Sequence, residues 1–417
     1  MIKTSNYCRL CNYKKLSKKL ILKPIPLSEK FNSKPFNKNS LKNFPISLGH
    51  CENCKSVQTN EVVSPNLLWS DFTYLSGQTK FIVNHFKNLA DQFKKRFDLK
   101  KNDLILDIGS NDGTFLNFFK KKGMKVVGVD PAKNLATLAN KKGIFTYGEF
   151  FNNKTIKKIK RKYKKKAKLI LCFNTFAHSE NLRDIVKNIH DILDERGVFV
   201  FECQYLRDIY DKKILGTIFH EHMYHHSISS LSNLFDYFNL NLYDAKLVNI
   251  QKGSILGFVT KNKSKNKTKE ILKLKNIEKK KGYISNKKFD DLRKFINHQK
   301  KKAKRIIKQF DKNKIGSYGS ARSGPTYALN FSLSKCIKFI FDDHPLKVNK
   351  FTSFLNIKVL PTKDISKIKP FLLIILAYLH SKKIIKSNLN YLKNGGAFLL
   401  VYPEIILINK KNYKKFI

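Results

Sequence analysis

A buried strand, a glycine-containing turn, a helix and a second buried strand follow one another early in this 417-residue chain. The first strand is LILDIG at 104–109, the turn is SNDG, the helix is TFLNFFKKKG, and the second strand is MKVVGVD at 124–130. Further apolar strands at 168–174 and 197–202 are separated by the helical stretch NLRDIVKNIHDILDE. This alternation predicts an α/β fold built on a doubly wound parallel sheet.

The same alternation resumes near the C-terminus. KIGSYGS at 314–320 is followed by a helix near 324–332 and by the strand KFIFDD at 338–343, and two more apolar strands lie at 371–377 and 397–403. We therefore expect a second, smaller α/β unit of Rossmann-like type.

The charge of the chain is strongly positive but diffuse. Lys and Arg total 83 against 31 Asp and Glu, a formal charge of +52, but only nine of the 83 are Arg and the Lys are spread along the whole chain. Specific base and phosphate recognition favours clustered Arg, so we expect no specific nucleic-acid partner. The Lys-rich stretches 154–168 and 261–312 are interpreted as solvated helices, the second as a connector.

No apolar run of membrane-spanning length occurs, and the first residues contain no apolar signal core. We therefore expect no membrane span and a cytoplasmic location.

Two cysteine pairs lie in the first 60 residues, a region that its prolines mark as irregular. Cys8-x-x-Cys11 and Cys51-x-x-Cys54 each place two thiolates on a short knuckle, and four thiolates make the closed tetrahedral site of structural zinc. His50 is a competing ligand. The other three cysteines stand alone in apolar runs and are interpreted as core thiols.

The turn after the first strand is suited to a nucleotide-like cofactor. Gly109 permits a tight turn, the turn amides can meet a carboxylate, and an acid that ends the next strand can accept bonds from ribose hydroxyls. The full G-x-G-x-x-G pattern of NAD sites is missing, which favours S-adenosylmethionine (SAM). The predicted cofactor-binding residues are Asp107, Gly109, Asn111, Asp112, Gly113 and Asp130.

Polar residues also follow the later strands of the first unit. Asn174 and His178 come after one strand, and Glu202 and Tyr205 end the next. The segment TIFHEHMYHH at 217–226 is not the H-E-x-x-H of zinc proteases, but a His beside a carboxylate is a credible proton-transfer pair.

Taken together, these motifs resemble the zinc-containing nucleotide-sugar C-methyltransferases, which act on keto-deoxy sugars. The likeness runs through essentially the whole chain and is carried by CRLC, CENC, NEVVSPNLLWSDFTYLSG, DIGSNDGTF, NTFAHSENL, ECQYL, FHEH, SYGSARSGPT and the DD-H-P stretch at 342–345. It implies a zinc-binding domain at 1–68, a SAM-dependent methyltransferase domain at 69–245 and a Rossmann-like domain at 246–417, with the sugar nucleotide between the last two.

The resemblance also implies individual roles. His222 would be the base that removes the proton beside the keto carbon, with Glu221 orienting or polarising near it. Tyr74 and His178 would line the reacting sugar. Asn174 and Tyr205 would belong to the substrate pocket, and Ser320 and Arg322 would meet the diphosphate.

Three positions depart from the family pattern. Phe219 stands where Tyr is usual, Arg322 where Lys is usual, and Leu256 where Arg is typical, which leaves the nucleotide and the exact sugar open. The methylated ring carbon and the oligomeric state are open too, and a monomer would suffice. Two other functions remain as alternatives: methylation of oxygen or nitrogen in another small polar substrate, and an inactive binding module in polysaccharide assembly.

Overall fold

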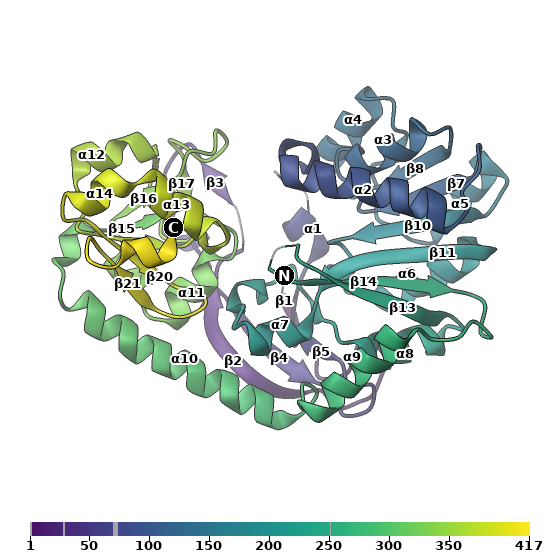
Figure 1. Ribbon diagram of the computed structural model, residues 1–417, viewed down its shortest axis with the longest axis horizontal. Helices are drawn as coiled ribbons and strands as arrows, with labels where there is room; N and C mark the ends of the chain where they lie inside the picture. The colour runs from purple at the N-terminus through teal and green to yellow at the C-terminus, as the bar shows by residue number, and fades with distance from the viewer. Residues whose placement is uncertain (1, 28–29, 70–73, 251) are drawn as a thin grey trace.

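The structure is a computed structural model that describes residues 2–27, 30–69, 74–250 and 252–417. Figure 1 shows two α/β lobes side by side, one built mainly from the middle of the chain and one from its C-terminal part. Strands from the N-terminal residues lie between and below the lobes, and a long helix runs along the lower edge toward the C-terminal lobe. Residues 70–73 of the family-like segment 60–77 lie outside the described residues.

The central lobe is built on a sheet of seven strands in the order β13-β14-β11-β10-β7-β8-β9. The strands from β11 to β9 are parallel, and β14 runs antiparallel between β11 and β13. Chain order reverses between β7 and β10, the place where open α/β sheets bind ligands. The strands are β7 (Leu104–Ile108), β8 (Lys125–Val129), β9 (Thr146–Tyr147), β10 (Ala167–Phe173), β11 (Leu193–Gln204), β13 (Asn241–Val248) and β14 (Ser254–Thr260).

Helices cover both faces of this sheet because alternate side chains of each strand enter two separate cores. Ile105 and Leu171 pack with one set of helices, whereas Leu104 and Leu106 pack with the other. The first set is α2 (Lys80–Arg96), α3 (Thr114–Lys120) and α4 (Lys133–Lys141), and the second is α5 (Asn153–Tyr163), α6 (Leu182–Ile192) and α8 (Ile228–Tyr237).

The C-terminal lobe repeats this plan on a six-stranded sheet in the order β18-β16-β15-β19-β20-β21, in which only β21 is antiparallel. Chain order reverses between β15 and β19, so the Rossmann-like prediction is confirmed. The strands are β15 (Ile315–Tyr318), β16 (Phe339–Phe341), β18 (Val359–Leu360), β19 (Leu372–Ile375), β20 (Ala397–Leu400) and β21 (Ile406–Ile408), with helices α11 (Gly324–Asn330), α12 (Ile365–Ile368), α13 (Ser381–Ser387) and α14 (Leu389–Lys393).

The prolines in the first 60 residues predicted an irregular region, but the structure has regular strands there. They form most of a four-stranded antiparallel sheet, β12-β5-β4-β2, in which the nine-residue strand β2 contains Pro24. Because β2 is the edge strand of that sheet, a proline costs it no inner ladder bond. The bounds are β2 (Ser17–Ile25), β4 (Phe44–His50), β5 (Val57–Thr59) and β12 (Tyr224–His225), with β1 (Ile2–Thr4) paired to β6 (Glu61–Val63) and β3 (Phe31–Asn32) paired to β17 (Phe351–Thr352).

Short elements complete the N-terminal part and its junctions. Helix α1 (Pro65–Trp69) follows β6 and leads toward the central lobe, and α7 (Leu206–Asp211) follows β11. Strand β12 belongs to the chain's middle but pairs with β5, so the N-terminal sheet is joined to residues 224–225.

The predicted boundary at residue 246 falls inside the central sheet. Strand β14 pairs with both β11 and β13, so that sheet continues to Thr260. The Lys-rich stretch that follows is helical, as predicted, and forms α9 (Lys269–Lys280) and α10 (Asn286–Ile307). Each helix buries one face, including Leu274 of α9 and Leu292 of α10, so they are packed elements with a solvated side.

Among the described residues, no helix combines the length and the apolar character that crossing a membrane requires.

Candidate active site

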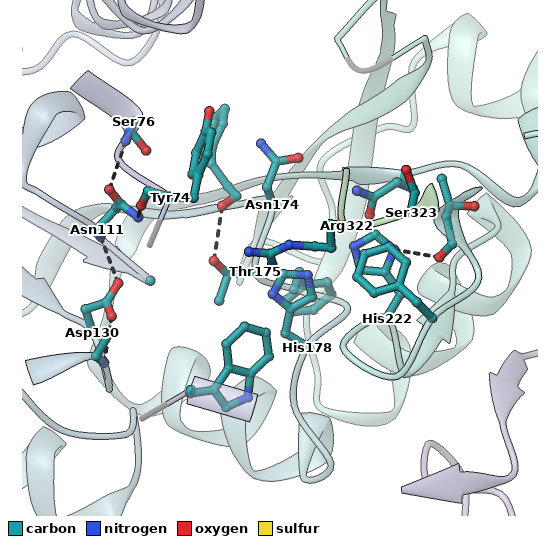
Figure 2. A pocket seen from close by; sticks show the side chains of 18 of the residues that line it. Tyr74, Ser76, Asn111, Asp130, Asn174, Thr175, His178, His222, Arg322 and Ser323 are labelled. Carbon is teal, nitrogen blue, oxygen red and sulfur yellow. Dashed lines mark hydrogen bonds between the residues drawn. The ribbon is translucent and has the colours of Figure 1, made fainter. Parts of the chain in front are cut away.

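A cavity of about 1080 Å³ lies where the three parts of the chain meet. Its walls come from the turn after β7, from the loops after β10 and β11, from α1 and Tyr74, and from the C-terminal lobe. Figure 2 shows Asn111 and Asp130 on one side of this pocket and His178, His222 and Arg322 on the other, with Asn174 between them.

The turn after β7 is held by backbone geometry that its sequence provides. Gly109 has φ 74°, and a Cβ there would overlap the Oγ1 atom of Thr175. The backbone N–H of Asn111 donates to Asp130 Oδ2 at 2.8 Å, and that of Ala132 donates to Asp130 Oδ1 at 2.9 Å. The acid that ends β8 therefore fixes the turn and still presents its outer lone pairs to the cavity.

Asn111 also joins the turn to the segment that carries Tyr74. Its side-chain Oδ1 accepts from the backbone N–H of Ser76 at 3.0 Å, and its Nδ2 donates to the Tyr74 carbonyl at 3.0 Å. Tyr74 lines the same cavity, and burial raises the pKa of its hydroxyl. The predicted cofactor turn thus positions one of the predicted substrate residues.

Buried polar atoms without partners test whether the cofactor fits here. Among the described residues nothing hydrogen-bonds Asp107 Oδ1 or Ser110 Oγ, although both atoms are buried and both residues line the cavity. Burial, and secondly the charge of Asp130, raise the pKa of Asp107 to about 8, and burial raises that of Asp130 to about 6. A ligand bearing an ammonium group and hydroxyls, as SAM does, satisfies these acceptors, so the residues fit the cofactor.

Two of the predicted cofactor residues lie outside the cavity wall. Asp112 pairs with Lys142 at 2.8 Å and accepts a hydrogen bond from the Thr114 hydroxyl at 2.7 Å, and Gly113, at φ 75°, lies against Ile144. Both residues support the conformation of the turn and do not face the cavity.

Four rings form a column along one wall of the cavity. Trp69 stacks on His178 with ring centroids 5.0 Å apart and planes 20° apart, and His178 stacks on His222 at 5.1 Å and 17°. Phe219 is the fourth ring and packs on His222 with centroids 4.1 Å apart and planes tilted by 39°. Each such contact contributes about 0.5–1.5 kcal/mol beyond burial, so the column restrains the planes of both imidazoles.

The hydrogen bond of His222 defines which ring nitrogen is available. Its Nδ1 lies 2.7 Å from the carbonyl oxygen of Thr217, which can only accept, so Nδ1 carries the hydrogen in the neutral ring. Burial lowers the pKa of this imidazole to about 4, and it lowers the pKa of His178 well below its usual range. His222 is therefore neutral near pH 7, with Nε2 as its acceptor.

The other predicted site residues divide between the cavity and its surroundings. Asn174 lines the cavity, and its buried Oδ1 has no hydrogen-bond partner among the described residues. Arg322 lines it from the C-terminal lobe. Glu221 lies behind Arg322, with Oε2 3.4 Å from Nη1, and contributes to the site through that guanidinium.

Tyr205 and Ser320 are not where we predicted them. Tyr205 is 1% exposed, does not line the cavity, and donates its hydroxyl to Glu278 at 2.8 Å, so it joins β11 to α9. Its neighbour Gln204 lines the cavity instead. Ser320 does not line the cavity, and its backbone N–H donates to Asp342, which does.

The two departures from the family pattern that change chemistry fall in different places. Phe219 lines the cavity and packs on His222, so the missing hydroxyl bears on the site. Leu256 is 2% exposed in a hydrophobic core and does not line the cavity, so its change is one of packing.

The C-terminal lobe contains a second turn with the same hydrogen bonds as the first. Asp342, which follows β16, accepts from the backbone N–H of Ser320 at 2.8 Å and from that of His344 at 2.9 Å. Asp130 makes the equivalent pair of bonds at 2.8 and 2.9 Å. Asp342 and Lys347 line the cavity, and neither was singled out as a site residue from the sequence.

The four predicted metal ligands come together in the N-terminal part. The Sγ atoms of Cys8, Cys11, Cys51 and Cys54 all lie within 4.8 Å of one another, with Cys8 and Cys54 at 3.5 Å and Cys11 and Cys51 at 3.6 Å. Tetrahedral zinc with bonds of ~2.3 Å would place its sulfurs about 3.8 Å apart, so the cluster fits zinc. His50 is outside this group and packs against Phe289.

Three family models match the chain in succession. A zinc binding domain matches residues 8–69, a methyltransferase domain matches 83–245, and a C-methyltransferase C-terminal domain matches 249–403. Among curated proteins, C-methyltransferase NovU of Streptomyces niveus is 25% identical over 373 residues, which covers 88% of this chain and 89% of that protein.

Solved structures of methyltransferases match less than half of the chain. One is a SAM-dependent methyltransferase from Clostridium acetobutylicum, with 15% identity, a TM-score of 0.34, and coverage of 43% of this chain and 91% of that one. Another is magnesium protoporphyrin IX methyltransferase from Synechocystis with bound SAM, with 13% identity, a TM-score of 0.33, and coverage of 46% and 86%.

The doubly wound central lobe, its acid-capped turn and the matched methyltransferase domain define a SAM-dependent methyltransferase. The order of the three matched domains is more specific. The chain carries a zinc binding domain, a methyltransferase domain and a C-methyltransferase C-terminal domain in succession, with SAM as its cofactor and a structural zinc in its N-terminal domain.

Proposed function

We propose that this C-methyltransferase acts on a nucleotide-linked 4-keto-deoxy sugar and methylates the carbon beside the keto group. The observation that carries the proposal is the neutral imidazole of His222, whose Nδ1 is engaged by Thr217 so that Nε2 is the acceptor, in the wall of a cavity between two nucleotide-type turns. A carbon nucleophile must first lose a carbon-bound proton to a base. Oxygen and nitrogen nucleophiles attack through lone pairs and need no base that removes a proton from carbon.

The surroundings of His222 suit a base that is charged only briefly. Burial keeps the ring neutral in the resting enzyme, and the rings of Phe219 and His178 both pack against it. An aromatic face stabilises a cation above it by about 0.5–2 kcal/mol. His222 can therefore accept the proton from the acidified C–H while water is kept away.

The negative charge that develops on the keto oxygen needs a partner. Arg322 brings a fixed positive charge to the cavity, and Tyr74 brings a hydroxyl. Glu221, bonded to Arg322, limits the motion of the guanidinium. Preorganised donors of this kind stabilise an enolate because they need no reorganisation during the reaction.

The second turn supports a nucleotide as the handle of the substrate. Asp342 is held by Ser320 and His344 as Asp130 is held in the cofactor turn, so its outer lone pairs are available to hydroxyls of a nucleoside sugar. The cations that line the same side of the cavity can balance a diphosphate, and they are Arg322, Lys347 and Lys383.

SAM, when bound, supplies an electrophilic methyl group on a sulfonium sulfur. The residues of the first turn would hold it through its ribose, ammonium and carboxylate groups, and the column of rings would face the substrate. The task of the protein is then to keep methyl group and carbanion aligned.

The test is incubation with methyl-labelled SAM and a panel of nucleotide-linked 4-keto sugars. We expect label in one of them and, without cofactor, deuterium exchange at the carbon beside the carbonyl. Exchange that His222→Ala abolishes would support the proposal. Methylation of oxygen or nitrogen with no exchange would overturn it and favour the alternative function.

A further inference from the structure

The N-terminal domain takes a direct part in the walls of the active site. Ser64, Pro65, Asn66 and Trp69 line the cavity, and all four precede the central lobe in the chain. Trp69 ends α1 and is the only tryptophan of the protein.

Trp69 and Phe219 are the two end members of the ring column, and Trp69 is the one next to His178. Its indole lies over His178 at 5.0 Å, and His178 lies over His222 at 5.1 Å, with interplanar angles of 20° and 17°. The buried Nε2 of His178 has no hydrogen-bond partner among the described residues. Stacking, rather than a hydrogen bond at that atom, therefore limits the rotation of the His178 ring.

The same domain also grips the chain next to His222. The carbonyl of Met223 accepts from the backbone N–H of Thr59 at 3.0 Å and from Arg9 Nη2 at 3.1 Å, and Arg9 adjoins the zinc ligand Cys8. Met223 in turn donates its N–H to Ala177, next to His178, at 2.9 Å. The backbones of both histidines are thus tied together and to the zinc-binding domain.

We propose that Trp69 is a positioning residue for proton transfer, which it serves by holding His178 flat against His222. The inference rests on the proposed role of His222 as base. If the indole is removed, the His178 ring can turn, and His222 loses the stacked contact that restrains the plane of its imidazole. The zinc-binding domain then acts on catalysis through this side chain.

The kinetic test compares Trp69→Leu, Trp69→Phe and Leu67→Ala. Leu67 is on the same short helix, is exposed and does not line the cavity. We expect Trp69→Leu to lower kcat by about tenfold to a hundredfold, the usual scale of a misplaced reacting group. The affinity for S-adenosylhomocysteine and the zinc content should not change. Trp69→Phe keeps a stacking face and should recover most of kcat, and Leu67→Ala should match the parent.

The spectroscopic test needs no substrate. Trp69 is the only indole, and a protonated imidazole in contact with it quenches its fluorescence. Burial, and then the charges of His222 and Arg322, lower the pKa of His178 well below its usual range, so we expect a quenching transition at acid pH that His178→Asn removes. Tyr74, Glu180 and Asp184 are further ionisable groups that line the same cavity.

The two tests separate the inference from the proposed function. A parent enzyme that methylates no keto sugar refutes the proposed function, and the stack is then judged by the fluorescence transition alone. Full kcat in Trp69→Leu, or a transition that persists unchanged in His178→Asn, overturns the positioning role.

Discussion

The Nδ1 atom of His222 lies 2.7 Å from the carbonyl oxygen of Thr217. Because that carbonyl can only accept a hydrogen bond, it selects one tautomer of the imidazole and leaves Nε2 unprotonated. The bond is made within a turn in which the backbone N–H of His222 donates to the carbonyl of Phe219 at 3.0 Å. This short segment therefore selects the protonated nitrogen of the proposed base, while the rings of His178 and Phe219 restrain the plane of its imidazole.

Replacement of this base should remove turnover and spare the cofactor site. We expect His222→Ala to lower kcat by about 10²–10⁴-fold, the usual contribution of general-base catalysis. Calorimetry should give the same dissociation constant for S-adenosylhomocysteine, since the cofactor turn is on the opposite side of the cavity. His190→Ala, a change at the surface of α6, is the matched control. Near-normal turnover in His222→Ala would contradict the assignment.

The acid limb of the profile of kcat/KM against pH should have its midpoint far below the pKa of an ordinary histidine. The base must be neutral to accept a proton, and burial lowers the pKa of His222 to about 4. We therefore expect kcat/KM to stay level down to about pH 5 and to fall below it, whereas an exposed imidazole would give a midpoint near pH 6.5. Initial rates after rapid pH jumps measure this limb. A midpoint near pH 6.5 would show that the ring is solvated or that another group is the base.

The features that could be predicted from the sequence are those whose functional residues lie close together in the chain. The turn at 109–113 and the two Cys-x-x-Cys knuckles each contain all the residues that their geometry needs within a few positions. The structure does not place Tyr205 in the predicted substrate pocket, because neighbouring residues at a strand end point to opposite sides. Gln204, one position earlier, lines the cavity, and Tyr205 contacts Glu278.

The residues that sequence reasoning missed are positioned by packing between distant segments. Trp69 meets His178 across more than a hundred residues, and no local pattern records that contact. Asp342 had a signal that could have been used, since it ends a strand after a glycine turn as Asp130 does. The matched domains divide the chain between residues 245 and 249, close to the predicted boundary at 246. The sequence did not reveal that the antiparallel strand after this point pairs back onto the central sheet.

Loss of zinc should impair catalysis more than cofactor binding. We expect one zinc per chain by elemental analysis, and Cys51→Ser should lose it, because three thiolates and a hydroxyl bind zinc far more weakly. The knuckle then loosens, and with it the hold of the N-terminal domain on Met223 and on His178. Activity should fall while S-adenosylhomocysteine still binds. Cys336→Ser changes a buried thiol outside the cluster and is the control, and a folded, active, zinc-free Cys51→Ser enzyme would contradict the prediction.

The guanidinium of Arg322 should matter for the substrate and not for SAM. We expect Arg322→Met to raise KM for the sugar nucleotide by about 10–100-fold, since a charge-assisted hydrogen bond contributes ~1.5–3 kcal/mol. It should also lower kcat, because the developing charge on the keto oxygen loses its partner. Arg322→Lys keeps the charge and should lose less. Arg322 also pairs with Glu221, so thermal unfolding of each variant must be compared with the parent. Lys382→Met removes an exposed cation that does not line the cavity and should leave KM unchanged.

The two acid-capped turns should be separable by one pair of matched variants. Asp130→Asn and Asp342→Asn make the same change at equivalent positions, and each leaves one oxygen to accept a backbone bond. We expect Asp130→Asn to weaken S-adenosylhomocysteine by about 10–100-fold and to spare uridine and thymidine diphosphates, because a charged acceptor of ribose hydroxyls is lost only in the first turn. Asp342→Asn should do the reverse. Calorimetry with both kinds of ligand on both variants gives four dissociation constants. Equal losses of affinity for both ligands in one variant would mean that its turn collapses rather than loses a contact. An unchanged diphosphate affinity in Asp342→Asn would exclude this turn of the C-terminal lobe as the nucleotide-binding site.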